Sequence, residues 1–381
     1  MKWIAAVFCI LTWFTNPLWA QLQTSAMPFY EWSTFSMGAD LSYVNQIEDN
    51  GGIYRDSSFS KDPFLIFASH GANTVRVRLW HSPQWTADLN AGHSYSDILD
   101  VEKTIRRAKN AGMAVNLDIH YSDEWADPQH QNTPEAWAKL DLNTLADSVY
   151  NYTYSVLNYL KAKNLTPEMV QVGNETNTGM LWPSGKVENE NWLPFAKLLN
   201  SGIKAVRDFS TTSAIKPRII LHVAQFQTAD WWLAGIMLKG GVTDFDIVGV
   251  SHYQKWSDLK TLPETGKAIK NLKEKYHKDV MIVEVAYPWT DQNIDTYHNI
   301  IGAADSISGY PATADGQFRY MKDLTDQVFK AGGSGIMYWE PAWITSDMND
   351  KWGKGSAWEN CSFFDFNNNA LPVFRFMSLA Y

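Results

Sequence analysis

Cysteine is nearly absent from this chain. Only two occur in 381 residues, Cys9 and Cys361, and Cys9 lies in an N-terminal segment that we expect to be removed. One remaining thiol cannot form an intramolecular disulfide, so a large hydrophobic core must supply the stability, which this length permits.

Basic clusters, long apolar runs and linkers are also missing. The formal net charge is −9, and without a long Lys/Arg cluster we expect no nucleic acid partner. Beyond the N-terminus no stretch approaches the roughly 20 apolar residues of a transmembrane helix. We find no Pro/Ser-rich linker, internal repeat or low-complexity tract. These absences favour one domain, and we expect a monomer.

The first 20 residues, MKWIAAVFCILTWFTNPLWA, have the pattern of a secretory signal peptide. Lys2 precedes an apolar stretch over 3–14, and Ala20 stands before a polar residue. This pattern predicts removal of residues 1–20 and a secreted, periplasmic or extracellular protein of residues 21–381. A buried N-terminal helix is the alternative. No small-residue lipobox precedes Cys9, so we expect no lipid anchor.

Short β-rich runs alternate with helical stretches along residues 21–381. This alternation predicts an α/β fold, a single (β/α)₈ TIM barrel with long loops on its C-terminal face. The predicted strands are 36–41, 74–80, 114–120, 169–173, 218–224, 247–252, 280–285 and 335–339. The predicted helices include 98–110, 142–162, 193–209 and 323–331.

Polar and aromatic residues gather after the predicted strands and not before them. The segments that follow the strands read WHSPQW, HYSDEWADP, NETNTGMLWP, HYQKW, YPWTD and WEPAW. Parallel barrels place their active sites at the C-terminal ends of the strands. The 18 tryptophans also suit a carbohydrate groove, because indole faces stack on sugar rings, although large cores use tryptophan as well.

Two glutamates end predicted strands, Glu175 in EMVQVGNET and Glu284 in DVMIVEVA. Paired carboxylates are the minimal equipment for cleaving a glycosidic bond. We assign Glu175 as acid/base, with a pKa raised by partial desolvation and a nearby negative charge. Asn174 would bind the sugar 2-hydroxyl, and Glu284 would be the nucleophile. Helix capping or pairing with arginines is the alternative for both glutamates.

Arg76 and Tyr253 are the expected hydrogen-bond donors to Glu284. Arg76 and Arg78 alternate on one strand, so both would point into the barrel and require carboxylate partners. We favour Arg76 as the partner of the nucleophile, with a purely structural salt bridge as the alternative. The roles of Arg78 and of Glu340, a third strand-end acid ranked below Glu284, stay open.

Asp118 and His120 alternate on the third predicted strand. His120 could support the catalytic pair or bind a sugar hydroxyl, or it could be structural. A zinc cluster of His120, Asp123, Asp127 and His252 is the rival interpretation, but the spacing matches no standard zinc motif.

The remaining strand-end residues are candidates for substrate binding, with Trp339 as the platform under the reacting sugar. Each tryptophan could instead be plain packing. The predicted substrate-binding residues are Asp118, Trp125, Asp127, Trp182, His252, Trp256, Trp339 and Trp343.

From about Met37 to the C-terminus the chain resembles glycoside hydrolase family 53, the endo-β-1,4-galactanases. The resemblance rests on the runs GADLS (38–42), ANTVRVRLW (72–80), DIHYSDEWADPQHQNTPEAW (118–137), VQVGNETNTGMLWP (170–183) and YWEPAW (338–343). It implies a (β/α)₈ barrel with Glu175 as acid/base and Glu284 as nucleophile. It further implies retaining hydrolysis of the β-1,4-galactan side chains of pectin, a polysaccharide substrate, with no cofactor required for the chemistry.

The resemblance also raises the question of calcium. Bacterial members can hold a calcium ion in the loop after the seventh strand, which here reads TDQNIDTYHN. Asp291, Asn293 and Asp295 stand at alternate positions and offer the oxygen ligands that calcium prefers. A structural calcium there is one expectation, and a solvated turn is the other.

Two other functions remain open. Another β-1,4-glycanase of the same clan, of mannanase or cellulase type, would share the catalytic core. A non-catalytic carbohydrate-binding barrel is disfavoured by the presence of both glutamates and Asn174.

Overall fold

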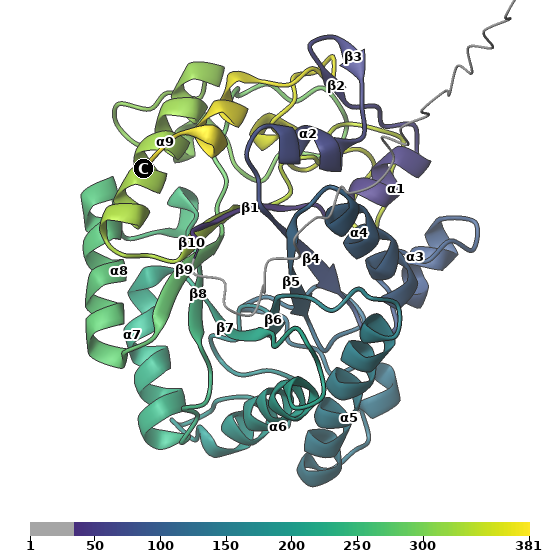
Figure 1. The fold of residues 1–381 in the computed structure, drawn as a ribbon, viewed down its shortest axis with the longest axis vertical. Coiled ribbons are helices and arrows are strands. Elements are labelled where there is room, and N and C mark those ends of the chain that lie inside the picture. Colours follow the sequence, from purple (N-terminus) through teal and green to yellow (C-terminus); the bar gives the residue numbers. More distant parts are fainter. Residues whose placement is uncertain (1–33) are drawn as a thin grey trace, which may run out of the picture.

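Eight short strands pair in parallel and close into a barrel, in the order β1-β10-β9-β8-β7-β6-β5-β4 (Figure 1). The computed structural model describes residues 34–381. The predicted (β/α)₈ fold is therefore confirmed, while the predicted signal peptide lies outside the described residues. The barrel strands are β1 (Ser36–Asp40), β4 (Thr74–Leu79), β5 (Ala114–Ile119), β6 (Met169–Val172), β7 (Arg218–Ala224), β8 (Ile247–Ser251), β9 (Asp279–Glu284) and β10 (Gly335–Tyr338).

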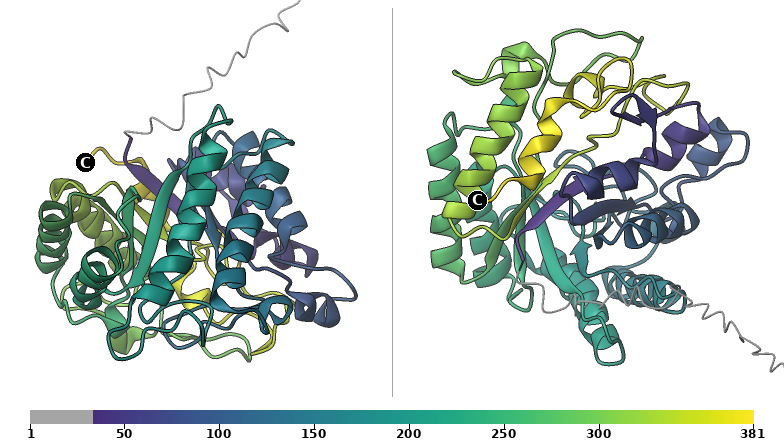
Figure 2. Two further views of the ribbon diagram at one scale, coloured as in Figure 1. Left: turned by 90° about the horizontal axis from the view of Figure 1, so that it is seen from below. Right: turned by 45° about the horizontal axis from the view of Figure 1, so that its top comes forward.

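Helices cover the outside of the barrel (Figures 1 and 2). The longer ones are α4 (Ile98–Asn110), α5 (Leu142–Lys161), α6 (Leu193–Ser210), α7 (Phe226–Ala234), α8 (Leu262–Tyr276) and α9 (Ala314–Lys330). Shorter elements are α1 (Val44–Asp49), α2 (Pro63–Ser69), α3 (Gln84–Leu89) and the hairpin of β2 (Arg55–Asp56) and β3 (Phe59–Ser60). The C-terminal 3₁₀ segment Pro372–Ser378 packs against α9. Within the described chain, no helix is both long and apolar enough to cross a membrane.

Two helix predictions need correction. The helix predicted over 323–331 begins nine residues earlier, where the Thr313 hydroxyl accepts a hydrogen bond from the backbone N–H of Gly316 at 3.0 Å. Helix α8 was not among the predicted helices. Its start carries a readable signal, because the Glu264 carboxylate accepts the backbone N–H of Thr261 at 2.9 Å, as in a capping box.

The barrel interior is apolar in one layer and polar in the next. Met169, Ile220, Ile247, Met281, Val283 and Met337 form a buried cluster inside the barrel. On β7, His222 comes two residues after Ile220, and its side chain is also fully buried, but among polar partners. Side chains two residues apart on a strand face the same side. The inward-facing positions of the barrel strands are therefore apolar at first and polar nearer the C-terminal ends of the strands. The apolar cluster is thus the floor on which the polar site rests.

We predict that Ile220→Ala lowers the free energy of unfolding by about 2–5 kcal/mol, because it opens a cavity in this floor. Ile220 is fully buried. The measurement is chemical denaturation, in which the midpoint should fall at constant slope. Leu238→Ala is the control, because Leu238 is 80% exposed and should change the midpoint little. Equal shifts for the two variants would contradict this picture of the interior.

Candidate active site

Arg76 is a buried guanidinium that gathers several carboxylates at the upper end of the barrel. Its Nη1 lies 2.7 Å from Asp40 Oδ2, and its Nη2 lies 2.7 Å from Asp118 Oδ2 and 2.8 Å from Glu284 Oε1. Nη2 also donates to Asn174 Oδ1 at 2.8 Å. Burial lowers the pKa of Arg76, but the three carboxylates outweigh it and raise that pKa above its ordinary value. The predicted contact between Arg76 and Glu284 is present.

Glu284 reaches the barrel interior through an irregularity in the pairing of β8 with β9. Val250 pairs with Ile282, but the next residue, Ser251, pairs with Glu284, so Val283 is an extra residue. A bulge of this kind re-aims the side chain that follows it. The Glu284 carboxylate forms an ion pair with Arg76 and accepts a hydrogen bond from the Tyr253 hydroxyl at 2.7 Å.

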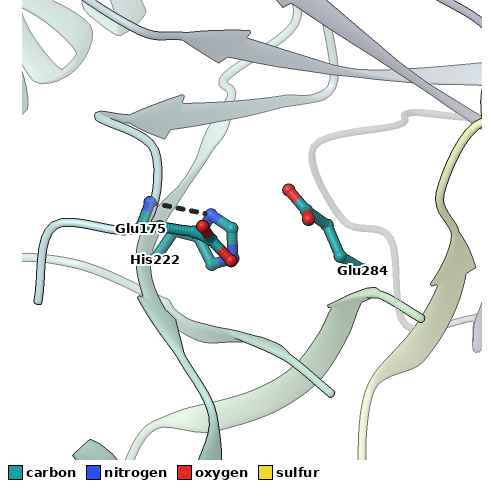
Figure 3. Close-up of side chains that lie close together, drawn as sticks. All are labelled: Glu175, His222 and Glu284. Atoms are coloured by element: carbon teal, nitrogen blue, oxygen red, sulfur yellow. Dashed lines mark hydrogen bonds between the residues drawn. The ribbon is translucent and has the colours of Figure 1, made fainter. Parts of the chain in front are cut away.

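Glu175 lies at the end of β6 in a left-handed backbone conformation, with φ of 44°. Its backbone N–H donates to His222 Nδ1 at 3.2 Å (Figure 3). The Ser251 hydroxyl, which lies 2.8 Å from His222 Nε2, acts on the Glu175 carboxyl group and lowers its pKa, against the larger effect of burial. A positive φ outside glycine is uncommon and costs conformational energy, which the surrounding contacts must offset.

The two glutamates face each other across the top of the barrel. An oxygen of Glu175 and an oxygen of Glu284 lie within 4.8 Å of each other. Burial and the charge of Glu284 raise the pKa of Glu175 well above its ordinary value. Burial also raises the pKa of Glu284, but Arg76 and Tyr253 oppose that rise. Glu284 therefore ionises first, and Glu175 keeps its proton longer.

His222 on β7 is a site residue that the sequence reasoning missed. Its Nδ1 accepts the Glu175 N–H, so the ring proton lies on Nε2, which donates to Ser251 Oγ at 2.8 Å. Burial holds the pKa of His222 well below its ordinary value, so the ring is neutral. The alternation of Ile220, His222 and Ala224 on β7 could have revealed it, because these three residues share the inward face.

A cavity of about 450 Å³ opens above the glutamate pair. Predicted site residues that line it are Trp125, Asp127, Asn174, Glu175, Tyr253, Trp256, Glu284 and Trp339. Trp358 and Gln225 also line it and were not predicted. The Trp358 ring lies edge-on to Trp339, with ring centroids 4.6 Å apart. Nothing local in the sequence marks Trp358, because a long loop brings it to the site.

Two predicted site residues lie beneath the cavity instead of in its wall. Asp118 is fully buried and accepts from Arg76 and, at 2.7 Å, from Gln171. His120 Nε2 donates to Asp118 Oδ2 at 3.0 Å, and its Nδ1 accepts the Ala126 N–H at 3.2 Å. Neither ring nitrogen of His120 is left for a sugar hydroxyl. Asp118 and His120 can therefore position Arg76, but they cannot touch substrate.

The substrate-binding role predicted for His252 does not fit its position. Ser251 faces the barrel interior, so the next residue faces the surrounding helices. The His252 ring is buried there beside Phe226, and its Nε2 lies 3.2 Å from Thr265 Oγ1.

Two predicted tryptophans also lie away from the cavity wall. The Trp343 ring is 3% exposed and donates from Nε1 to the Gly355 carbonyl, so it is part of the scaffold. Trp182 is half-buried and is not among the residues that line the cavity.

Arg78 and Glu340, whose roles the sequence left open, pair with each other. Arg78 Nη1 lies 3.1 Å from Glu340 Oε1, and both side chains are buried. The guanidinium also lies over the rings of Tyr43, Trp80 and Trp125, at 4.1 to 4.6 Å from their centroids. Glu340 does not line the cavity, so this pair supports the Trp125 wall and offers no rival nucleophile.

Side-chain oxygens of Asp291, Asn293 and Asp295 already accept hydrogen bonds from backbone N–H groups. Asp291 Oδ1 accepts the Ala303 N–H at 2.7 Å, and Asn293 Oδ1 accepts the Asn299 N–H at 3.0 Å. Both oxygens of Asp295 accept backbone N–H groups as well. Calcium needs several oxygens that converge on it. These residues do not fit the predicted calcium site, because their oxygens hold the loop together.

The rival zinc cluster is not assembled either. His120 bonds Asp118, Asp123 lies 3.3 Å from His81, Asp127 bonds His130, and His252 faces the outer helices. In residues 34–381 the one group of such side chains close enough to hold a metal is Glu175, His222 and Glu284. Both ring nitrogens of His222 already form hydrogen bonds, so neither is free to bind a metal. The arrangement of these three side chains suits proton transfer instead.

Comparisons with known proteins agree on one family. The sequence profile of glycosyl hydrolase family 53 matches residues 36–377. An arabinogalactan endo-β-1,4-galactanase of Cellvibrio japonicus (strain Ueda107) is 47% identical over 352 residues, covering 91% of each chain. The solved GH53 catalytic domain of Ignisphaera aggregans is 33% identical, with a TM-score of 0.83, over 92% of this chain and 97% of that one. A fungal β-1,4-galactanase structure is 30% identical, with a TM-score of 0.77, over 91% and 100%.

We predict that Glu340→Gln destabilises the protein by about 3–5 kcal/mol, because it leaves the buried Arg78 without a charged partner. The measurement is the free energy of unfolding at neutral pH. Asp326→Asn is the matched control, because it breaks the exposed Lys330–Asp326 pair, and exposed pairs contribute little. A Glu340→Gln protein as stable as wild type would show that the Arg78–Glu340 pair is not needed by the scaffold.

Proposed function

The chain belongs to glycosyl hydrolase family 53, and on that premise we propose that it is a retaining endo-β-1,4-galactanase. Its substrate would be the galactan of type I arabinogalactan, the side chains of pectin. The observation that carries the proposal is the pair Glu175 and Glu284 in a tryptophan-lined cavity. The 47% identity to a named arabinogalactan endo-β-1,4-galactanase supports the substrate class.

The short spacing of the two glutamates supports retention of configuration. Retaining glycosidases hold their carboxyl groups about 5–5.5 Å apart, and inverting ones about 6.5–9.5 Å apart, because a water must fit in the second case. The approach of two oxygens within 4.8 Å fits the shorter spacing.

In the first step the Glu284 carboxylate attacks the anomeric carbon and the bond to the leaving sugar breaks. Glu175 gives its proton to the leaving oxygen, so a glycosyl-enzyme ester and a shortened chain result. In the second step Glu175 takes a proton from water, whose oxygen displaces Glu284. The sugar is released with its original configuration, and Glu175 is again protonated.

The hydrogen bonds around each glutamate suit these roles. Arg76 and Tyr253 hold the Glu284 carboxylate as the ionised form that attacks. Ser251, itself held by neutral His222, acts on Glu175 without adding a positive charge that would strip its proton. Asn174 is fixed by Arg76 and by the Ala126 carbonyl at 2.8 Å, in position for the 2-hydroxyl of the reacting sugar.

Endo action is supported by a groove that continues beyond the central cavity. A neighbouring hollow shares Trp125 and Asp127 with the cavity and adds Trp352. A further hollow shares Glu124 and Lys351 with that one and adds Trp85. A long groove accepts the interior of a polymer, whereas a closed pocket would accept only its end.

We also propose that the protein is secreted and acts outside the cell. A signal peptide over residues 1–20 and a monomeric enzyme of residues 21–381 suit an enzyme whose substrate is a polymer too large to enter a cell. The chemistry requires no cofactor, because two carboxylates and water suffice.

The proposed function is tested by comparing polysaccharides. Linear β-1,4-galactan should release reducing ends at least tenfold faster than galactomannan or carboxymethylcellulose under equal conditions, and the early products should be mixed oligosaccharides. Preferred cleavage of mannan or cellulose would identify a different β-1,4-glycanase of the same architecture. No turnover on any of them would leave a non-catalytic sugar-binding barrel.

We predict that Glu284→Ala nearly abolishes turnover, and that sodium azide restores cleavage of an aryl β-galactobioside. Azide would enter the space vacated by the carboxylate and displace the leaving group directly, so the product is the α-galactobiosyl azide. The anomeric configuration of the product is read by NMR. A β-azide from this variant would exchange the roles of the two glutamates.

We predict that Glu175→Ala lowers kcat/KM on galactan by about 10²–10⁴-fold, because the leaving sugar needs the proton. A dinitrophenyl β-galactobioside, whose leaving group needs no proton, should form the glycosyl-enzyme almost normally. The acid must be protonated to act, so wild-type activity is lost as pH rises through the raised pKa of Glu175. That alkaline limb should disappear from the pH profile of Glu175→Ala, and its persistence would contradict the assignment.

A further inference from the structure

Gln225 is the first residue after β7, and its backbone is held in a conformation that glutamine rarely adopts. Its φ is 65° and its ψ is 136°. Side chains disfavour this region, and such strain costs on the order of 1–3 kcal/mol. Glycine would adopt the same backbone without that cost. Something other than backbone geometry must therefore favour a glutamine at this position.

The surrounding backbone keeps the strained conformation in place. The Gln225 N–H donates to the Ser251 carbonyl at 2.9 Å. Asn177 exchanges two hydrogen bonds with the backbone of Ala224, at 2.8 and 3.0 Å. The Gln225 carbonyl accepts from the Thr228 hydroxyl at 3.0 Å. These contacts hold the backbone of Gln225, and therefore the direction in which its Cβ leaves the chain.

Gln225 forms part of the wall of the catalytic cavity, and its side-chain oxygen has no protein partner in the described chain. The residue is 8% exposed, and Oε1 is buried with no hydrogen bond from residues 34–381. An unpaired buried acceptor costs about 1–3 kcal/mol. A strained backbone and an unpaired amide oxygen at one position both indicate a group that binds a ligand.

The order of the strands places Gln225 on one side of the glutamate pair. Going round the barrel from Glu175 on β6 to Glu284 on β9, one path crosses β7 and β8, and the other crosses β5, β4, β1 and β10. Trp125 follows β5 and Trp339 follows β10, and their ring centroids are 5.9 Å apart. Gln225 and Trp256 lie along the β7–β8 path, on the other side of the cavity.

This division identifies which sugar Gln225 faces. The sequence predicts Trp339 as the platform of the reacting sugar, and the continuing groove past Trp125 extends from that side. The sugar beyond the bond to be cleaved then lies over the β7–β8 side. Trp256, whose indole is 48% exposed, stands there beside Gln225 and can stack on a sugar face.

Resting on the proposed function, we infer that Gln225 and Trp256 form the binding site for the leaving-side sugar, with the Gln225 amide accepting one of its hydroxyl protons. Gln225 is then a specificity residue, since it acts only when the leaving group is a sugar. The same position receives an acceptor sugar when the glycosyl-enzyme is intercepted, because the second step is the first in reverse.

The test is the ratio of kcat/KM on galactan to kcat/KM on an aryl β-galactobioside, which has no sugar on the leaving side. Gln225→Met keeps the length and shape of the side chain but removes the amide. The ratio should fall about tenfold, the size expected for one hydrogen bond to a buried neutral group. Transfer to added galactobiose, measured against hydrolysis, should fall with it. Gln84→Met, on exposed α3 away from the cavity, is the matched control and should keep the wild-type ratio.

The variant Gln225→Gly tests whether the Gln225 side chain binds the sugar or only stabilises the fold. Relief of the backbone strain should leave the melting temperature equal to wild type or higher, while the galactan-to-aryl ratio falls as in Gln225→Met. A purely structural glutamine would instead lower the melting temperature and reduce both activities together. An unchanged ratio in either variant of a wild-type protein that cleaves galactan overturns the inference. A wild-type protein that does not cleave galactan overturns the proposed function first.

Discussion

The structure of the site depends on the buried guanidinium of Arg76. Three carboxylates, from Asp40, Asp118 and Glu284, converge on it together with the amide oxygen of Asn174. Buried carboxylates are expensive unless they are paired, so Arg76 makes the whole polar layer possible. It joins β1, β4, β5, β6 and the end of β9 in one network. Glu284, Asn174 and the scaffold carboxylates are therefore positioned by a single cation, and loss of that cation would affect all of them.

The two glutamates differ because their neighbours differ. Glu284 pairs with the cation Arg76 and accepts a hydrogen bond from the phenol of Tyr253. The neutral Ser251 hydroxyl, held by neutral His222, acts on Glu175. Both are desolvated, so burial alone would raise both pKa values alike. The asymmetry of the hydrogen-bond donors sets the order in which the pair ionises. The difference between the two carboxyl groups is thus set by Arg76, Tyr253, Ser251 and His222, and in the proposed function it separates the acid from the nucleophile.

Strain is concentrated where strands end at the catalytic face. Glu175, Gln225 and Glu340 each have a positive φ. Each follows a barrel strand directly or within two or three residues, and each is followed by a change of chain direction. Glu175 lines the cavity, Gln225 holds an unpaired amide oxygen in its wall, and Glu340 is paired below with Arg78. The same backbone conformation therefore occurs at three strand ends whose side chains have different surroundings.

The sequence by itself determined the barrel, the position of each strand within one or two residues, and which residues stand at the strand ends. Local alternation and turn residues carry that information, and it was enough to associate Arg76 with Glu284. The tertiary structure decided the rest. The bulge at Val283 turns Glu284 inward. His222, Ser251 and Asp40 lie on strands that the sequence predicted, but only their contacts with residues distant in sequence place them in the site. His252 and Trp343 lie outside the cavity wall, and the carboxylate of Asp295 accepts hydrogen bonds from backbone N–H groups. The physical reason is that a period of two stops predicting side-chain direction once φ turns positive or a residue is inserted, and partners across a barrel are chosen by contacts distant in sequence.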